Sequence, residues 1–186
     1  MVLLDALINS AVQGMQSFSL TEAMLFFTKI GGIYFILAMT LGIITYLLLK
    51  KRYSKLSAFV VGIGGGIVLR TILKYLFKRP RPTGGIINET GYSFPSGHTL
   101  LSTIFFLFLI YLFAREIKNK TLRILFVSIN VMLILLIGFS RIYLGVHWFT
   151  DVIGAIFIGM IWVTISIKFS DAKHVKKLIN QKVYKP

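Results

Sequence analysis

A histidine and an aspartate four residues apart form the clearest chemical pair in the sequence. His147 and Asp151 end the segment Ser140-Arg141-Ile-Tyr-Leu-Gly-Val-His147-Trp-Phe-Thr-Asp151, where a long apolar run begins. Residues at i and i+4 share one face of a helix, so the carboxylate can orient one ring nitrogen and leave the other for a substrate. The pattern is typical of a histidine nucleophile. A structural His–Asp pair that ties down a helix end is the alternative.

A second polar motif, Pro95-Ser96-Gly97-His98, runs directly into another apolar segment. A helix that begins here leaves backbone N–H groups free, and we expect the Ser96 hydroxyl to point outward beside them. Phosphate binds readily at the positive end of a helix dipole, which would place His98 next to an anion site. An ordinary helix cap with an interfacial histidine is the alternative.

Cations gather in a third segment. If the helix there continues, Arg70, Lys74, Lys78 and Arg81 fall at i, i+4, i+8 and i+11 and share one stripe. A lysine or arginine at a helix end can snorkel to the lipid headgroups, which would account for Lys78 or Arg79. Arg70 lies roughly two turns deeper in the membrane, where a cation needs an anionic partner. Either Arg70 braces the loop by pairing with Glu89 or with backbone carbonyls, or Arg70 or Lys78 contacts a second phosphate or headgroup.

Together these groups favour phosphoryl transfer through a covalent intermediate, with cations neutralising the phosphate charge. The acids on this side of the chain are not at metal-ligand spacing, so we expect no metal and no cofactor; they are Asp5, Glu22, Glu89 and Asp151. The sequence has no cysteine, which excludes thiolate sites and disulfides. It has no Walker A motif, and the run Gly62-Ile-Gly64-Gly65-Gly66 favours close helix packing rather than nucleotide binding.

The three segments resemble the signature of the type 2 phosphatidic acid phosphatase (PAP2) superfamily, which also contains glucose-6-phosphatase and the vanadium haloperoxidases. Its motifs K-x6-R-P, P-S-G-H and S-R-x5-H-x3-D are matched in full and in order. The resemblance implies a set of phosphate-binding residues: Lys74, Arg81, Ser96, Gly97, His98 and Arg141. It further implies that His147 is the nucleophile, that Asp151 orients it, and that His98 protonates the leaving group.

Apolar runs between the motifs predict the elements that position them. A transmembrane helix needs about 20 apolar residues. The runs that meet this need, some of them only narrowly, cover residues 30–49 and about 56–77, 98–114, 122–140 and 148–167. The predicted fold is therefore an all-α transmembrane bundle of about five spans, forming one domain over residues 1–186.

The first 29 residues differ from these spans. Residues 3–17 carry apolar side chains at helical spacing with polar ones opposite, which predicts an amphipathic interfacial helix rather than a span. Ser19-Leu20-Thr21-Glu22 fits a capping box that opens a further helix toward Lys29. Bacterial lipid phosphatases of the PAP2 superfamily usually have six spans, so the amphipathic helix would replace the first.

Composition and charge support a membrane protein. The hydrophobic fraction is 56% and the charged fraction 15%, against about 25% charged residues in soluble domains. Most of the net charge of +15 lies in basic segments at 50–55, 115–123 and 168–185, and two predicted spans separate each segment from the next. All three then share one face, which is cytoplasmic by the positive-inside rule. The charge therefore needs no nucleic acid partner, and the motifs face the extracytoplasmic side.

We expect an integral enzyme of the cytoplasmic membrane that removes phosphate from a lipid phosphomonoester or diphosphate. The resemblance offers phosphatidylglycerophosphate, undecaprenyl diphosphate, phosphatidic acid and lipid A phosphates as substrates, and the sequence does not choose among them. The expected partners are the bilayer and the lipid substrate, with no obligate protein partner. Two alternatives stay open: a non-catalytic lipid carrier and a vanadate-dependent haloperoxidase-like enzyme, although those relatives are soluble.

Overall fold

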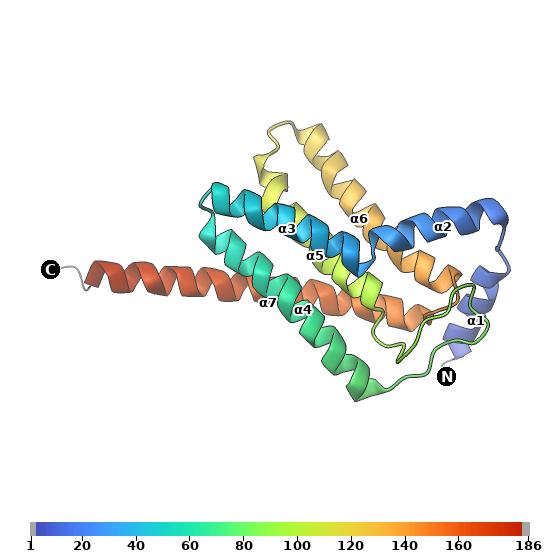
Figure 1. Ribbon diagram of the computed structural model, residues 1–186. Coiled ribbons are helices and arrows are strands. Elements are labelled where there is room, and N and C mark those ends of the chain that lie inside the picture. Colours follow the sequence, from blue (N-terminus) through green and yellow to red (C-terminus); the bar gives the residue numbers. More distant parts are fainter. Residues whose placement is uncertain (1–2, 184–186) are drawn as a thin grey trace.

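The computed structural model describes the backbone of residues 3–183 and the side chains of residues 3–171, and within these bounds it contains helices and no strands. The elements are α1 (Leu3–Gln13), α2 (Phe18–Ile30), α3 (Ile33–Leu49), α4 (Tyr53–Phe77), α5 (Gly97–Phe113), a 3₁₀ turn (Ala114–Glu116), α6 (Lys120–Tyr143) and α7 (Phe149–Val183) (Figure 1). The all-α prediction is confirmed.

Helix α5 forms the centre of the bundle. It packs against α3, α4, α6 and α7, and most of its side chains are buried. Aromatic rings fill the core beside it, with Phe59 of α4 in edge contact with Phe108 at a centroid distance of 5.5 Å. Burial of such large apolar side chains stabilises the packing of α5 against its neighbours.

Glycines let α4 approach its neighbours closely, as the sequence predicts. A methyl group added at Gly62 would overlap the ring of Phe108, and one added at Gly65 would overlap the indole of Trp162. The Trp162 indole N–H also donates to the Gly62 carbonyl at 2.9 Å. The glycine run therefore serves helix packing.

Four helical segments are long and apolar enough to cross a membrane: Tyr53–Phe77, Gly97–Glu116, Lys120–Tyr143 and Phe149–Asp171. The span predicted over residues 30–49 is present only as α3, which begins at Ile33 and has 17 residues, at the short end of the range for a separate span. The chain breaks at Gly31 and Gly32, and α2 and α3 together qualify as one span bent by 44°. Within the described residues there are thus four candidate spans, or five if this bent pair crosses the membrane.

The predicted amphipathic helix is present as α1, but its polar side faces the protein. Asp5 and Asn9 are buried, whereas Leu3 and Leu7 are exposed, with exposed fractions of 75% and 60%. This orientation suits a helix whose apolar side lies in the bilayer interface.

The capping box predicted at residues 19–22 is wrong, because α2 begins earlier. Ser17 adopts an extended conformation, with φ −145°, and its hydroxyl accepts a hydrogen bond from the Leu20 N–H at 3.4 Å. The Ser17 N–H donates to the Tyr143 hydroxyl at 3.1 Å, so a tertiary contact fixes this start.

All three motifs lie at one end of the bundle, together with α1 and the irregular segment 78–96 (Figure 1). The basic loop before α4 and the turn after α5 lie at the other end, where Arg52 and Lys55 pair with Glu116. Two of the three predicted basic segments therefore share a face. In the third basic segment, residues 168–185, the side chains beyond position 171 lie outside the described residues.

Candidate active site

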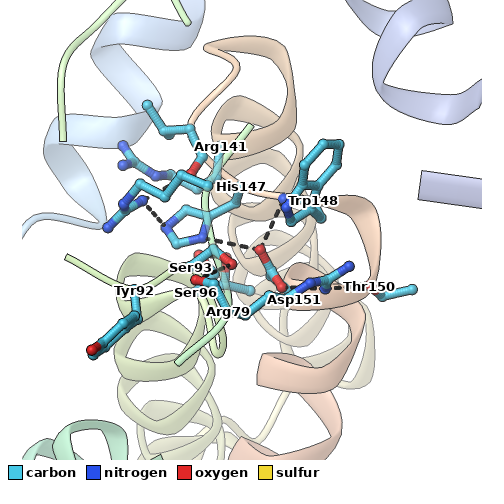
Figure 2. A network of polar contacts seen from close by, with 12 residues as sticks. Arg79, Tyr92, Ser93, Ser96, Arg141, His147, Trp148, Thr150 and Asp151 are labelled. Atoms are coloured by element: carbon cyan, nitrogen blue, oxygen red, sulfur yellow. Dashed lines mark hydrogen bonds and ion pairs between the residues drawn. The ribbon is translucent and has the colours of Figure 1, made fainter. Parts of the chain in front are cut away.

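The predicted His–Asp pair lies at the start of α7. His147 precedes this helix and is 1% exposed, and its Nδ1 lies 3.5 Å from Asp151 Oδ2 (Figure 2). Asp151 is fully buried, and the same carboxylate oxygen accepts the Trp148 N–H at 2.9 Å. The chain reaches this helix through a tight turn at Gly145, where φ is +70°. This turn directs His147 toward the end of α4.

His147 is neutral at physiological pH. Burial lowers the pKa of its imidazole to about 4, and Arg141 and Arg81 act in the same direction, while Asp151 partly opposes them. A neutral imidazole has a lone pair on one ring nitrogen. With Nδ1 turned toward Asp151, the free nitrogen is Nε2, which lies 3.2 Å from a guanidinium nitrogen of Arg81.

A polar cavity of about 360 Å³ opens in front of His147. It is lined by Arg70, Lys74, Arg81, Asn88, Glu89, Thr90, Gly97, His98 and His147. The structure thus brings together both predicted catalytic histidines and three predicted phosphate-binding residues from segments that are far apart in the sequence. Asn88 and Thr90 also contribute, although the motifs did not indicate them.

The predicted stripe of four cations is interrupted. Helix α4 ends at Phe77, and Lys78 caps it in the left-handed conformation with φ 44°, so the spacing rule fails beyond Lys74. Lys78 is exposed and does not line the cavity. Arg81 reaches the cavity from the irregular segment instead, where it donates to the Val146 carbonyl at 2.8 Å.

The predicted Arg70–Glu89 ion pair is wrong. Arg70 lies over the first turn of α5, where a methyl group added at Gly97 would sit 2.5 Å from its Nε. Glu89 pairs with Arg141 and with Arg81, the latter at 3.1 Å. Arg81 of the irregular segment and Arg141 of α6 therefore pair with the Glu89 carboxylate, and Arg70 of α4 remains on the cavity wall.

The carboxylate of Glu89 lies in the middle of the predicted phosphate-binding groups. Besides its two arginine partners, it lies 3.9 Å from His98 Nδ1 and 3.9 Å from His147 Nε2. Burial alone would raise the pKa of Glu89, but the positive charges around it, Arg141 foremost and also Arg81, hold the pKa below its usual value. The carboxylate is therefore ionised and occupies an anion position.

Two predicted phosphate-binding residues do not line the polar cavity. Ser96 is fully buried, its hydroxyl lies 2.9 Å from the Thr99 hydroxyl, and its N–H donates to the Asp151 carbonyl. The expectation of an outward hydroxyl is wrong, because Thr99 offers a buried partner one turn further along α5. Arg141 is 1% exposed, and its guanidinium reaches the site through Glu89 while also contacting Thr28.

A larger apolar cavity of about 740 Å³ adjoins the polar one. Its walls include Phe26 and Ile30 of α2 and Phe35 of α3, where the bent helix pair turns. Glu89 and His98 line both cavities. The combined space suits an amphiphile whose anionic head enters the polar cavity and whose chains stay in the apolar one.

Buried polar residues behind His147 and Asp151 were missed by the sequence reasoning. Arg79, for which the sequence analysis offered only snorkelling, donates to Asp151 Oδ1 at 2.5 Å (Figure 2). It also donates to Asp5 Oδ2 at 2.5 Å. Asn9 donates to the His147 carbonyl at 2.9 Å. The sequence did place Asp5 and Asn9 on one face of a helix, but it gave no sign of what that face contacts. Within the described residues, no group of three or more His, Cys, Asp or Glu side chains is arranged to hold a metal ion.

Comparison with known proteins agrees with the motifs. Over 149 residues the chain is 29% identical to phosphatidylglycerophosphatase B of Bacillus subtilis, covering 76% of this chain and 71% of that protein. Over 175 residues it is 28% identical to undecaprenyl-diphosphatase of Sulfolobus acidocaldarius, covering 86% and 75%.

Two solved structures have the same overall fold. The transmembrane PAP2-type phosphatidylglycerolphosphate phosphatase of Bacillus subtilis superposes with a TM-score of 0.82 at 25% identity, covering 90% of this chain and 85% of that one. LpxE of Aquifex aeolicus superposes with a TM-score of 0.72 at 25% identity, covering 90% and 99%. Residues 55–174, which contain all three motifs, match the PAP2 superfamily, and the chain is therefore a member of that superfamily.

Proposed function

We propose that this membrane protein is a lipid phosphatase that hydrolyses a lipid phosphomonoester or diphosphate through a phosphohistidine intermediate. The observation that carries the proposal is the cavity in which a buried neutral histidine faces Lys74, Arg81 and His98, next to an apolar cavity of about 740 Å³. The relatives named above are phosphatases of lipid phosphates or diphosphates, which supports the same class of substrate.

In the proposed first step, the phosphate enters between Lys74, Arg81 and Arg141, with the Gly97 N–H at the start of α5 as a further donor. His147 Nε2 attacks phosphorus, and the bond from phosphorus to the lipid oxygen breaks. Protonated His98 gives its proton to the departing oxygen. Asp151 stabilises the positive charge that develops on the His147 ring.

In the second step, His98 accepts a proton from a water molecule, which attacks the phosphohistidine. The bond from nitrogen to phosphorus breaks, inorganic phosphate leaves, and both histidines return to their starting states. The cationic side chains neutralise the charge on the transferring phosphoryl group, which is the task that metal ions perform in other phosphatases. We therefore expect no cofactor requirement.

The position of the site favours a substrate at the outer leaflet of the cytoplasmic membrane. The motif end of the bundle lies opposite the basic loop at Arg52 and Lys55, which the positive-inside rule assigns to the cytoplasm. Arg70 lines the polar cavity and is free to contact a second phosphate or a headgroup, whereas Lys78 is exposed outside it. Arg70 therefore favours a diphosphate or phosphoglycerol headgroup over phosphatidic acid.

Phosphate release by the purified protein tests the proposal. The substrates are phosphatidylglycerophosphate, undecaprenyl diphosphate, phosphatidic acid and a lipid A phosphate, each presented in detergent with excess EDTA and without any other protein. We expect phosphate release from at least one of them at a rate that EDTA leaves unchanged. Binding of all four without phosphate release would indicate a lipid carrier, and a strict magnesium requirement would contradict the mechanism.

A further inference from the structure

The helix that carries the catalytic aspartate starts without a local cap. The first N–H groups of any α-helix lack partners within the helix, and a Ser, Thr, Asp or Asn just before it usually supplies one. Here the residue directly before α7 is Trp148, whose indole offers no acceptor, and the proposed nucleophile His147 precedes it. Some other part of the chain must satisfy the N–H groups of Phe149 and Thr150.

Helix α1 supplies these acceptors from the opposite end of the sequence. The Phe149 N–H donates to Asn9 Oδ1 at 3.2 Å, and the Thr150 N–H donates to Asp5 Oδ1 at 2.9 Å. The Thr150 hydroxyl donates to the second oxygen of Asp5 at 2.8 Å. The amide of Asn9 also donates to the His147 carbonyl at 2.9 Å, so α1 holds the chain on both sides of Trp148.

Arg79 extends this contact to the catalytic carboxylate. Its guanidinium joins Asp5 to Asp151 through two hydrogen bonds of 2.5 Å each, and it also donates to the Thr150 hydroxyl at 2.7 Å. Figure 2 shows Arg79 beside Asp151 and Thr150, on the side away from His147. Both carboxylate oxygens of Asp151 are thereby held in place: Oδ1 by Arg79, and Oδ2, which lies next to the His147 ring, by the Trp148 N–H.

The contact between α1 and the site is mainly polar. Asp5 is fully buried, and burial raises the pKa of its carboxyl, but the hydrogen bonds from Thr150 and Arg79 outweigh burial and lower the pKa overall. Leu3, Leu4 and Leu7 of α1 are exposed, while Ile8 and Val12 make its apolar contacts with the protein. A helix that served only to cover the core would bury those leucines rather than an ionised aspartate.

We propose that α1 is a positioning element of the catalytic site, in which Asp5 and Asn9 cap α7 and, with Arg79, fix the geometry of His147 and Asp151. This inference rests on the proposed phosphatase function. Helix α1 lies outside residues 55–174, which match the superfamily, and Arg79 lies within them but is not a residue that the three motifs specify. Asp5, Asn9 and Arg79 touch no part of the polar cavity and act through the two catalytic residues.

The test compares the Asp5→Asn, Arg79→Gln and double variants with wild type, using p-nitrophenyl phosphate in detergent. We expect each single variant to lower kcat by at least about tenfold while KM stays within about twofold, because the phosphate-binding cations are untouched. The double variant should be no slower than Arg79→Gln alone, since both substitutions break the same ion pair between Asp5 and Arg79. Matched controls are Glu22→Gln, which removes one exposed charge, and Ser10→Ala on the exposed side of α1.

A second measurement separates positioning from simple stability. The fraction of each variant that binds tungstate, a phosphate analogue, counts the protein molecules with an intact anion site. The inference holds if kcat per tungstate-binding molecule falls in the Asp5 and Arg79 variants and stays at the wild-type value in the controls. It is overturned if the loss disappears after this correction, or if kcat is unchanged. A wild-type protein that releases no phosphate from any substrate would instead refute the proposed function itself.

Discussion

Replacing Glu89 by Gln should make the site bind phosphate more tightly, although the substitution removes a residue from the site. The carboxylate pairs with Arg141 and Arg81 and lies 3.9 Å from both His98 Nδ1 and His147 Nε2, in the volume that the phosphate must enter. Any incoming phosphate therefore has to displace this anion first. Glutamine keeps the size of the side chain but not the negative charge.

The size of the effect follows from the interactions that phosphate must break. A hydrogen bond to a charged group contributes about 1.5–3 kcal/mol. The Glu89 side chain is 24% exposed, and solvent screening favours the lower end of that range. Since about 1.4 kcal/mol corresponds to a factor of ten in affinity, we expect inhibition constants for phosphate and tungstate to fall by about tenfold.

Competitive inhibition of p-nitrophenyl phosphate hydrolysis by tungstate provides the assay, with Glu22→Gln as the control for loss of a negative charge elsewhere. Thermal unfolding gives an independent measurement. Without ligand, Glu89→Gln should melt at a lower temperature, because the buried guanidinium of Arg141 loses its carboxylate. A saturating anion should then stabilise the variant more than it stabilises wild type. An inhibition constant that is unchanged or higher in Glu89→Gln would show that the carboxylate does not compete with phosphate.

Three further predictions concern the histidines and Arg70. The pKa of His147 is about 4 in the folded protein against 6.5 in the unfolded chain. The unfolded chain therefore binds more protons between these two pH values. The free energy of unfolding should fall by about 3 kcal/mol as the pH drops from 6.5 to 4. His147→Asn should show a shallower loss over this window in unfolding measurements, and an equal slope would contradict the assigned neutral state. His98→Ala should slow hydrolysis of a lipid phosphate more than that of p-nitrophenyl phosphate, because general-acid help matters most for a basic leaving oxygen; equal losses would remove His98 from the acid role. Arg70→Met should change the ratio of diphosphate to monophosphate turnover if Arg70 contacts the headgroup, whereas a lower melting temperature with an unchanged ratio would leave it only a structural role.

The residues that line the polar cavity were largely predictable from the sequence. His147 and Asp151 meet because they lie only four residues apart across the start of α7, and Lys74 and Arg81 belong to the same short motif. The apolar runs likewise predict α4, α5, α6 and the start of α7 within a few residues, although α7 continues to Val183. Local periodicity does not detect the break at Gly31 and Gly32, because the residues on both sides are apolar and the run looks continuous.

The residues behind His147 and Asp151 were not predictable, because their positions depend on tertiary contacts. Asp5 and Asn9 reach α7 across more than 130 residues of sequence, and α1 alone looks like an ordinary amphipathic helix. Glu89 lies in a segment without regular structure, so no spacing rule indicates where its side chain points. The choice of Arg141 rather than Arg70 as its partner depends on how α6 crosses the start of α5.

Trapping the phosphoenzyme tests the central claim most directly. The purified protein would be mixed with substrate labelled at the terminal phosphate, quenched in alkali, under which phosphohistidine survives, and digested for peptide mapping. We predict a label on His147 in wild type, and no label in His147→Ala, which should still bind tungstate but lose several orders of magnitude in kcat. A label on another residue, or a His147→Ala variant that retains more than about a tenth of wild-type activity, would contradict the assignment of His147 as the nucleophile.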